Sequence, residues 1–592
     1  MIQDLIKQHI SSALKNLYQA ELNENNIVIE KTSADFDGDY TFVVFSYLKI
    51  SKKSAEQTAN EIGNYLSANF SELKSFNVIK GFLNLSIDDK FWIDFLIKNS
   101  ANTNFAFNKV KKPNTILVEY SSPNTNKPLH LGHIRNNLLG YAVSEILKAN
   151  GHLVKTCNLV NDRGVHICKS MLAWMKFGNG ENPETSKMKG DHLVGKYYVA
   201  FDKQYKKEIE ELKSSGLSQE EAEKNAASII EVQELLRKWE AGDEETVKVW
   251  QMMNSWVYAG FDVTYKNLGV SFDKFYYESN TYLLGKDIVN EGLQKNVFYK
   301  KDDASVWIDL TADGLDQKLL LRNDGTSVYI TQDIGTAELK HKDFNCERSI
   351  YVVGNEQEYH FKVLKLICEK LNKLYASGIY HLSYGMVELP EGKMKSREGT
   401  VVDADDLIDE MIRTAKETTE ALGKTEGLNE IELTELCETV GLGALKYFLL
   451  KVDPKKKMLF NPADSIDFHG NTGPFIQYTH ARIKSMLRAV TDDLTSCNIE
   501  KTSLNKFEKE LIYLSYQYTE IINEAAKELS PGLVCNYVFD LAKSFNQFYH
   551  ECPVLKESNE DQKKLRLMLC NMTANIIKSA FSLLGIKVPE RM

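Results

Sequence analysis

Several features that define other classes of protein are missing from this sequence of 592 residues. No apolar run is long enough to span a bilayer, and the opening stretch MIQDLIKQHISSALKNL has the pattern of an amphipathic helix. A secretory signal would instead show a basic start, an apolar stretch and a small-residue cleavage site. We therefore expect a cytoplasmic protein with no membrane partner.

Paired cysteines are missing as well. The nine cysteines are scattered, their number is odd, and no Cys-x-x-Cys spacing occurs. Disulfide frameworks and structural zinc sites use even numbers or closely spaced pairs. The sequence thus predicts small buried or half-buried thiols and no metal held by protein side chains.

An excess of positive charge is the third missing feature, since the net charge is −10. That excludes a protein that coats nucleic acid by charge alone, although an acidic chain can still carry a local basic face. The content of 43% hydrophobic and 26% charged residues is typical of a globular protein. The length predicts three or four domains.

The first and last parts of the chain differ in pattern. Residues 1–108 alternate short helical and strand patterns, such as DGDYTFVVFSYLKI and VIKGFLNLSI, and predict a small N-terminal α+β domain. Residues 465–592 contain four amphipathic helical patterns and no strand pattern. They predict a C-terminal all-α helical bundle.

The middle part, residues 109–464, predicts an α/β domain. TILVEY, HIRNNLLGYAVSEILKANG and HLVKTCNLV read as strand, helix and strand, which is a βαβ unit of a Rossmann-like parallel sheet. SVYIT, SIYVVG and YHLSYGMVEL are further strand candidates. The charged stretch at about 176–250 is helical in period and reads as an insertion.

The stretch SSPNTNKPLHLGHIRNN places two histidines at the start of the first predicted helix of this domain. His130 and His133 are three residues apart, follow the carboxyl end of a strand and lie at a helix N-terminus, which favours a phosphate group. Gly132 leaves room for a nucleotide to approach the backbone. The two imidazoles can therefore stabilise charge on phosphorus during adenylyl transfer. A pair of helix-capping or core histidines is the structural alternative, favoured if the motif stands alone.

A second cationic element lies further along the chain. EGKMKSREGTVV places Lys393, Lys395 and Arg397 in a glycine-bounded loop after a predicted strand. Such a loop suits a triphosphate and a departing pyrophosphate. In YITQDIG, Asp333 is expected at the end of another strand.

Together these stretches resemble a known family. His130-Leu131-Gly132-His133 is similar to the H-I-G-H motif of class I aminoacyl-tRNA synthetases, and KMKSR at 393–397 resembles their K-M-S-K-S loop. Nearly the whole chain resembles the arginyl-tRNA synthetases. The segments that carry this resemblance are VEYSSPNTNKPLHLGH, YITQDIG, YVVGNEQEYHF, NTGPFIQYTHARI and LGIKVPERM.

The resemblance implies an arginine–tRNA ligase. Such an enzyme activates L-arginine with ATP to arginyl-adenylate, with Mg²⁺ screening the phosphates, and passes arginine to the terminal adenosine of its tRNA. Members of the family generally need bound tRNA before they activate arginine, so we expect the same here. Nothing in the sequence demands a dimer, and we expect a monomer.

The resemblance also implies roles for individual residues. The catalytic positions would be His130, His133, Lys127 and Lys393. The ATP-binding positions would be Gly132, His130, His133, Gly354, His360, Met386, Lys393, Lys395 and Ser396. The arginine-binding positions would be Glu119, Ser121, Asn124, Tyr329, Asp333 and Gln357. In the C-terminal bundle Tyr478 and Arg482 would contact tRNA, and the N-terminal domain would contact its elbow.

Selection of arginine would depend on carboxylates. A guanidinium group is a planar fork of donors that paired carboxylates bind best, and the point charge of lysine fits such a pocket poorly. Glu119 ends the first predicted strand, so we expect it to face the same crevice as Asp333. Each could instead cap the following helix, but the family match favours the binding role. His360 could line the adenosine pocket or be a core histidine, and helix packing alone would also explain Tyr478.

The sequence departs from the class pattern at two places. Ser396 stands where the K-M-S-K-S loop has its second lysine; arginyl enzymes often lack that lysine and carry one just before the H-I-G-H motif. Lys127 occupies that place and is the expected substitute, although Lys395 could serve if the loop shifts its register. Arg163, in NLVNDRG, stands where many relatives have an aromatic residue.

Two other functions fit part of the sequence. A small-molecule nucleotidyltransferase shares an H-x-G-H-like element but needs no separate N-terminal domain or four-helix C-terminal domain, so the length argues against it. A non-catalytic tRNA-binding relative would lack His130, His133 or Lys393, and all three are present.

Overall fold

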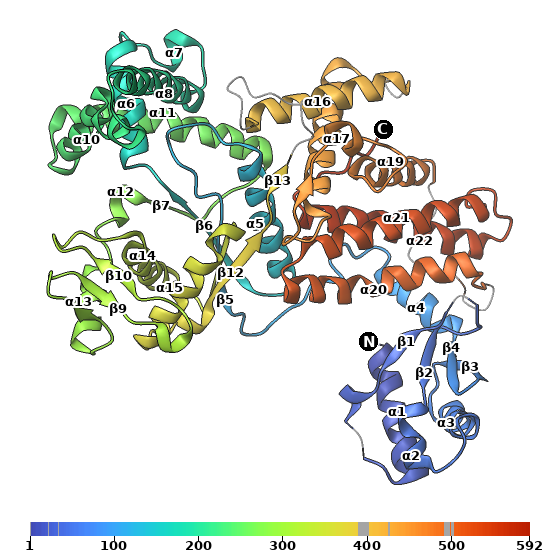
Figure 1. Cartoon of the computed structure of the whole chain (residues 1–592). Coiled ribbons are helices and arrows are strands. Elements are labelled where there is room, and N and C mark those ends of the chain that lie inside the picture. The colour runs from blue at the N-terminus through green and yellow to red at the C-terminus, as the bar shows by residue number, and fades with distance from the viewer. Residues whose placement is uncertain are drawn as a thin grey trace. The chain divides into compact units, whose positions relative to one another are not determined.

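The computed structural model describes residues 2–592 apart from 22, 34, 389–401, 424–426, 491–497 and 499–501 (Figure 1). Contacts divide the chain into two compact units. The first comprises 1–103, 486–517 and 543–575, and the second comprises 104–485, 518–542 and 576–592. The division at residues 108 and 464 stays a prediction.

A small α+β fold forms the beginning of the first unit. Four antiparallel strands are ordered β1-β2-β4-β3, α3 packs on β3 and β4, and α1 packs on α3. Ser54 and Gln57 form a capping box that starts α3. The elements are α1 (Ile2–Tyr18), β1 (Ile29–Lys31), β2 (Tyr40–Val43), α2 (Leu48–Ser51), α3 (Ala55–Asn69), β3 (Leu73–Ile79), β4 (Phe82–Ile87) and α4 (Asp89–Asn99).

The second unit is built on a five-stranded parallel sheet. Its order is β12-β11-β5-β6-β7, so the chain moves in one direction from β5 to β7 and in the other from β5 to β12. The order reverses beside β5, at the place where ligands bind in doubly wound sheets. This confirms the Rossmann-like prediction. The strands are β5 (Thr115–Glu119), β6 (Leu153–Val160), β7 (Lys274–Tyr277), β11 (Arg348–Gly354) and β12 (Ile379–Tyr384).

Helices and short strands connect and flank this sheet. The helices are α5 (Leu131–Ala149), α12 (Glu278–Thr281), α13 (Lys286–Gln294), α14 (Tyr329–Phe344), α15 (Glu358–Lys370), α16 (Ala404–Ala421), α17 (Glu430–Leu450) and α18 (Pro462–Ser465). The short strands are β8 (Tyr299–Lys300), β9 (Val306–Ile308), β10 (Lys318–Leu321), β13 (Val387–Glu388) and β14 (Met458–Leu459).

The strand predicted at SVYIT is wrong. Val328 is the N-cap of α14, and the residues that follow it are helical. Ile330, Ile334 and Ala337 are buried, and their spacing of four and three residues is that of a helix face. A short β-branched run does not distinguish a strand from a buried helical segment. Asp333 therefore lies in the first turns of a helix and not at a strand end.

A helical segment separates β6 from β7 and runs from residue 165 to 268, further than the stretch 176–250 on both sides. Its helices gather together in Figure 1, and α8 packs against both α6 and α11. They are α6 (Val165–Phe177), α7 (Pro183–Ser186), α8 (Gly190–Ser214), α9 (Gln219–Asn225), α10 (Ala227–Glu240) and α11 (Glu244–Leu268).

The C-terminal part is helical, as predicted. Within the described residues after β14 no strand occurs, and the main helices are α19 (Gly473–Arg488), α20 (Lys506–Glu528), α21 (Pro531–Glu551) and α22 (Glu560–Leu583). Gln477 and Lys446 donate hydrogen bonds to the carbonyls of Lys587 (2.8 Å) and Gly585 (2.6 Å), which fixes the terminal LGIKVPERM segment.

The described cysteines and helices bear on two expectations from composition. The eight described cysteines are all buried, as expected of small core thiols. In the described part of the chain, no helix combines the length and the apolar character needed to cross a membrane.

Candidate functional site

Lys127, His130 and His133 form a basic corner at the start of α5, beside the reversal of strand order. His130 is the N-cap of α5, and its Nδ1 accepts a hydrogen bond from the Gly132 amide at 3.1 Å. The Nδ1 of His133 accepts one from the His130 amide at 3.2 Å, and the ring centroids lie 3.9 Å apart. The histidines thus do cap the helix, but capping uses one nitrogen of each ring. In the tautomer that these bonds imply, Nε2 of each ring is a donor.

The basic corner is electrostatically strained. Burial, and then the charge of Lys127, lowers the pKa of His130 to about 4. Burial and the neighbouring His130 and Lys127 hold the pKa of His133 well below its usual value, and burial also lowers the pKa of the Lys127 ammonium. Both imidazoles are therefore neutral donors at neutral pH. An anion between them and Lys127 would be favoured.

A cavity of about 990 Å³ lies beside β6, α12 and the start of α14. Glu278 and Asp333 line it, together with Asn124 and Tyr329, and we name it the carboxylate cavity. Burial, and also the charges of Asp162 and Asp333, raises the pKa of Glu278 to about 7, although Arg163 acts against this. A half-buried carboxyl group whose pKa is raised by burial and by a neighbouring carboxylate is a favourable place for a cation.

Other charged side chains also line the carboxylate cavity. Lys286 and Arg322 are exposed. Arg163 is largely covered: its guanidinium donates to Glu240 at 2.7 Å and lies 3.9 Å from the ring centroid of Tyr282. Glu240 is therefore paired with an internal arginine, whereas Glu278 and Asp333 form no salt bridge with Lys or Arg among the described residues.

Glu119, which was expected to face the same crevice as Asp333, is not among the residues that line the carboxylate cavity. It ends β5 as predicted, but its side chain is only 8% exposed and pairs with the ammonium of Lys340, itself 3% exposed, from α14. Glu278, which was not predicted from the sequence, lines the cavity together with Asp333. It directly follows the strand KFYY, and a residue just after a parallel strand lies at the ligand-binding edge, but a strand of four residues is too short to be recognised from sequence.

Several other predicted residues lie at the same sheet edge without lining the cavity. Ser121 follows β5, is buried, and its hydroxyl lies 2.7 Å from that of Tyr265. Gly354 ends β11, Gln357 closes the turn after it, and Met386 follows β12 and is 45% exposed. They lie at the carboxyl ends of three parallel strands.

The imidazole of His360 contacts Asp333. Its Nε2 lies 2.6 Å from Asp333 Oδ2, so it contacts the carboxylate cavity through Asp333. Tyr478 and Arg482 are one turn apart on α19, with the guanidinium 4.7 Å from the ring centroid. The predicted loop residues Lys393, Lys395, Ser396 and Arg397 lie outside the described residues.

Three family models match successive parts of the chain. Residues 4–87 match the arginyl tRNA synthetase N terminal domain, 97–461 match the tRNA synthetases class I (R) catalytic domain, and 476–592 match the DALR anticodon binding domain. The arginine–tRNA ligase of Bacteroides fragilis is 55% identical over 600 residues, and the match covers 100% of both chains.

Solved structures share the fold. Arginyl-tRNA synthetase of Thermus thermophilus has a TM-score of 0.80 at 24% identity, and the match covers 100% of both chains. The enzyme from Plasmodium falciparum has a TM-score of 0.77 at 20% identity, over 100% of this chain and 99% of that one.

Proposed function

The chain belongs to the arginyl-tRNA synthetases of class I, and from this premise we propose how its residues divide the reaction. It is an arginine–tRNA ligase that uses ATP to activate L-arginine and joins the arginyl group to tRNA. The observation that carries the assignment of residues is the pair of oppositely charged sites, the basic corner and the carboxylate cavity, at one edge of the parallel sheet. The nucleotidyltransferase alternative leaves the N-terminal and anticodon-binding matches unexplained.

The basic corner would handle the phosphates. In the first step a carboxylate oxygen of arginine bonds to the α-phosphorus of ATP, and the bond from that phosphorus to the bridging oxygen of pyrophosphate breaks. The Nε2–H groups of His130 and His133 would donate to the phosphoryl oxygens, whose negative charge grows at this stage. Lys127 adds a cation that stands close enough to lower the pKa of both histidines.

Lys127 is therefore our choice for the cation that replaces the loop lysine absent at Ser396. Lys393 and Lys395 keep their proposed roles on the pyrophosphate side, and Gly132, Gly354 and Met386 keep theirs around ATP. Mg²⁺ would be held by ATP oxygens, because the neighbours that set the charge of the two histidines are basic groups and not carboxylates. The ion supplies charge screening on the phosphates.

The carboxylate cavity would select arginine. Glu278 and Asp333 would each accept N–H groups of the guanidinium fork, with Tyr329 beside them at the start of α14. His360 orients Asp333 through their hydrogen bond of 2.6 Å. Ser121, Asn124 and Gln357, at the strand ends, would hold the polar groups of the amino acid. Lysine would satisfy one carboxylate and leave the other unpaired, which disfavours it.

The second step moves the arginyl group to tRNA. A ribose hydroxyl of the terminal adenosine would attack the arginyl carbonyl, and AMP would leave. Tyr478 and Arg482 would stack on and neutralise the anticodon stem-loop, and the N-terminal α+β part would contact the elbow. We propose that the enzyme acts as a monomer in the cytoplasm, where tRNA is charged for translation.

ATP–pyrophosphate exchange tests this function. The assay is run with L-arginine or L-lysine, each with and without tRNA. We expect exchange with arginine only, and only when tRNA is present. Exchange with arginine alone would remove the tRNA requirement and keep the substrate; no exchange with arginine under either condition would overturn the proposal.

A further inference from the structure

An ion-pair cluster next to the basic corner joins three helices of the second unit. Lys189, the N-cap of α8, donates from Nζ to Asp405 Oδ2 on α16 at 2.5 Å and to the buried Thr264 hydroxyl on α11 at 2.6 Å. It also lies 3.2 Å from Asp191 Oδ2, whose side chain is fully buried. A single ammonium thus bonds to side chains of α8, α11 and α16.

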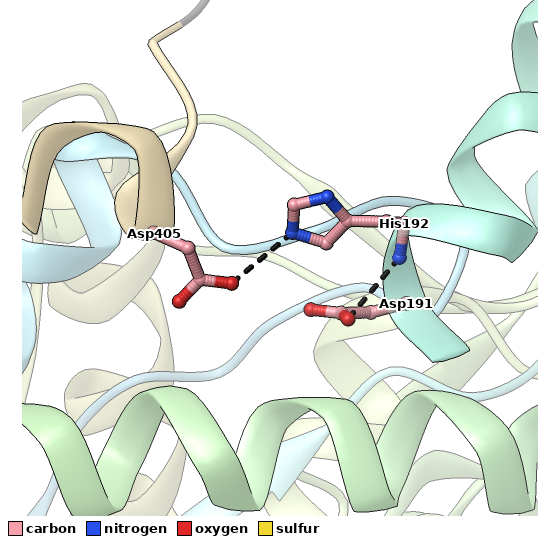
Figure 2. Close-up of side chains that lie close together, drawn as sticks. All are labelled: Asp191, His192 and Asp405. Carbon is pink, nitrogen blue, oxygen red and sulfur yellow. Dashed lines mark hydrogen bonds and ion pairs between the residues drawn. The ribbon is translucent and has the colours of Figure 1, made fainter. Parts of the chain in front are cut away.

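His192, in the first turn of α8, adds a second contact between this helix and Asp405 of α16. Its Nε2 lies 3.1 Å from Asp405 Oδ2 and 3.5 Å from Asp403 Oδ2. Figure 2 shows the ring of His192 directed across to Asp405, while the backbone of His192 contacts Asp191. We name Lys189, His192, Asp403 and Asp405 the clasp.

Two members of the clasp and the neighbouring Asp191 have the composition of a metal site, but the ammonium of Lys189 already supplies a positive charge there. Asp191, His192 and Asp405 each place a ligand-type atom within 4.8 Å of the others. The ammonium of Lys189 bonds to both carboxylates of that group. The charge that a metal would supply therefore comes from the protein itself, and the cluster is a structural link between elements.

The link leads directly to the basic corner. Asp403 is the N-cap of α16. Its two neighbours in sequence form backbone hydrogen bonds with the two neighbours of His130. Leu131 N donates to Val402 O at 3.0 Å, and Ala404 N donates to Leu129 O at 2.9 Å. His130 and Asp403 are partners in the resulting antiparallel bridge. The contacts that hold Asp403 and Asp405 in place therefore also hold the backbone on both sides of His130.

α8 reaches the basic corner by a second route. A Cβ at Gly195, on the same helix as His192, would lie 2.9 Å from Pro128 Cδ and 3.7 Å from the Cα of Lys127. Only glycine permits so close an approach. Thus α8 contacts the chain immediately before His130, while its clasp holds the segment that pairs with His130.

We propose that Lys189 and His192 are positioning residues for adenylate formation: from α8 they hold the 402–404 segment against residues 129–131 and so fix His130 and Lys127 for the α-phosphate. The proposal rests on the role assigned above to the basic corner. It gives the helices between β6 and β7 a function in the chemical step, since a displacement of about 1 Å at a reacting centre can cost on the order of 100-fold in rate.

The direction of the pH effect follows from the groups around His192. The charged groups against it are Asp403 and Asp405 from α16 and Asp191 and Lys189 from its own helix and cap. The hydrogen bond from Asp405, opposed by burial, raises the pKa of His192. The charged clasp is therefore complete below the ordinary pKa of histidine, and it weakens as the pH rises through the raised value in the folded protein.

Four variants test the proposal by arginine-dependent ATP–pyrophosphate exchange in the full-length enzyme at saturating tRNA. Lys189→Met and His192→Gln remove the two cationic contacts. Lys196→Met is the matched control, because it removes the same charge from α8 but no hydrogen bond or ion pair to α16 among the described residues: Lys196 pairs with Glu181 at 2.7 Å and lies 5.4 Å from the ring centroid of Tyr197. We expect Lys189→Met to lower kcat by about 10- to 50-fold with the KM for arginine unchanged, Lys189→Arg to restore part of the rate, and Lys196→Met to match the wild type.

His192→Gln separates positioning from general stability. The wild-type kcat should fall as the pH rises above the ordinary pKa of histidine, by a component that the variant lacks, since glutamine keeps a hydrogen bond but not the charge. His130 and His133 do not titrate in that pH range because their pKa values are lowered. Equal kcat in Lys189→Met and Lys196→Met, or an identical pH profile in His192→Gln and wild type, would overturn the inference. Absence of exchange in the wild type would instead overturn the proposed function.

If Lys189→Met does not fold, judged by circular dichroism, the pH profile of His192→Gln decides the question alone.

Discussion

The basic corner and the carboxylate cavity lie at one sheet edge but hold opposite kinds of charge. In the corner, burial lowers the pKa of His130 and His133 and the charge of Lys127 adds to the effect, so both rings are neutral donors next to Lys127. In the cavity, burial and neighbouring carboxylates raise the pKa of Glu278 to about 7. A substrate of opposite charge would stabilise the charged groups of each site. That substrate group is a phosphate in the basic corner and a guanidinium in the carboxylate cavity.

Glu119 is a carboxylate of the same sheet whose charge is neutralised by a neighbouring ammonium group. It ends β5 as Glu278 follows β7, yet Lys340 pairs with it in the protein interior. The difference separates a structural carboxylate from one available to a ligand. Position at a strand end is shared by both, so the internal partner is what distinguishes them.

The largest effect that we predict concerns this compensated pair. Glu119→Gln leaves the Lys340 ammonium buried without a counter-charge, and should lower the free energy of unfolding by about 3–5 kcal/mol. Urea denaturation measures the change. Among molecules that remain folded, the KM for arginine should stay within about twofold of wild type; a large rise in that KM at unchanged stability would return Glu119 to the arginine pocket.

Next in size is the loss of a donor in the basic corner. His130→Asn keeps a good helix cap but removes the Nε2–H group, and should lower kcat for ATP–pyrophosphate exchange by about 10²- to 10³-fold. The KM for arginine should not change, because the arginine site lies in the cavity. A kcat within a factor of three of wild type would mean that His130 only caps α5.

Removal of one cavity carboxylate should affect the other substrate. Glu278→Gln and Asp333→Asn each remove one charged acceptor for the guanidinium fork, and should raise the KM for arginine by about 10- to 100-fold with a smaller change for ATP. Steady-state exchange kinetics give both constants. If the KM for ATP rises and that for arginine does not, the two sites have been assigned the wrong way round.

The pH dependence of arginine binding should be smaller, about tenfold or less. Glu278 has a raised pKa of about 7, so it gains its charge as the pH rises through that value, while the guanidinium stays charged. The KM for arginine should therefore fall between pH 6 and pH 8. In Glu278→Gln this component should disappear; its persistence would place the titrating group elsewhere.

The smallest effect should come from outside both sites. Arg482→Gln removes one cation proposed to neutralise tRNA phosphate, and should raise the KM for tRNA by a few-fold, more at low salt than at high salt. Exchange at saturating tRNA should be unchanged. An altered KM for ATP or arginine would show instead that α19 supports the catalytic unit.

The sequence by itself determined the layout of the chain and most of its motifs. Short apolar runs predicted the strands β5, β6 and β11, and period-3.6 patterns predicted α5 and the four C-terminal helices, because these elements bury one face or both. The loop between β5 and α5 could be assigned to phosphate chemistry because a helix start and two histidines are local features.

Only the tertiary structure decided the partners of buried charges. Glu119 and Lys340 are far apart in sequence, and neither pattern nor spacing indicated that they pair; Glu278 lies after a four-residue strand too short to be recognised. The SVYIT run folded as a helix because its apolar residues face the interior at helical spacing. A local pattern reports which face of an element is buried, whereas the neutralisation of a charge depends on which distant residue the fold places next to it.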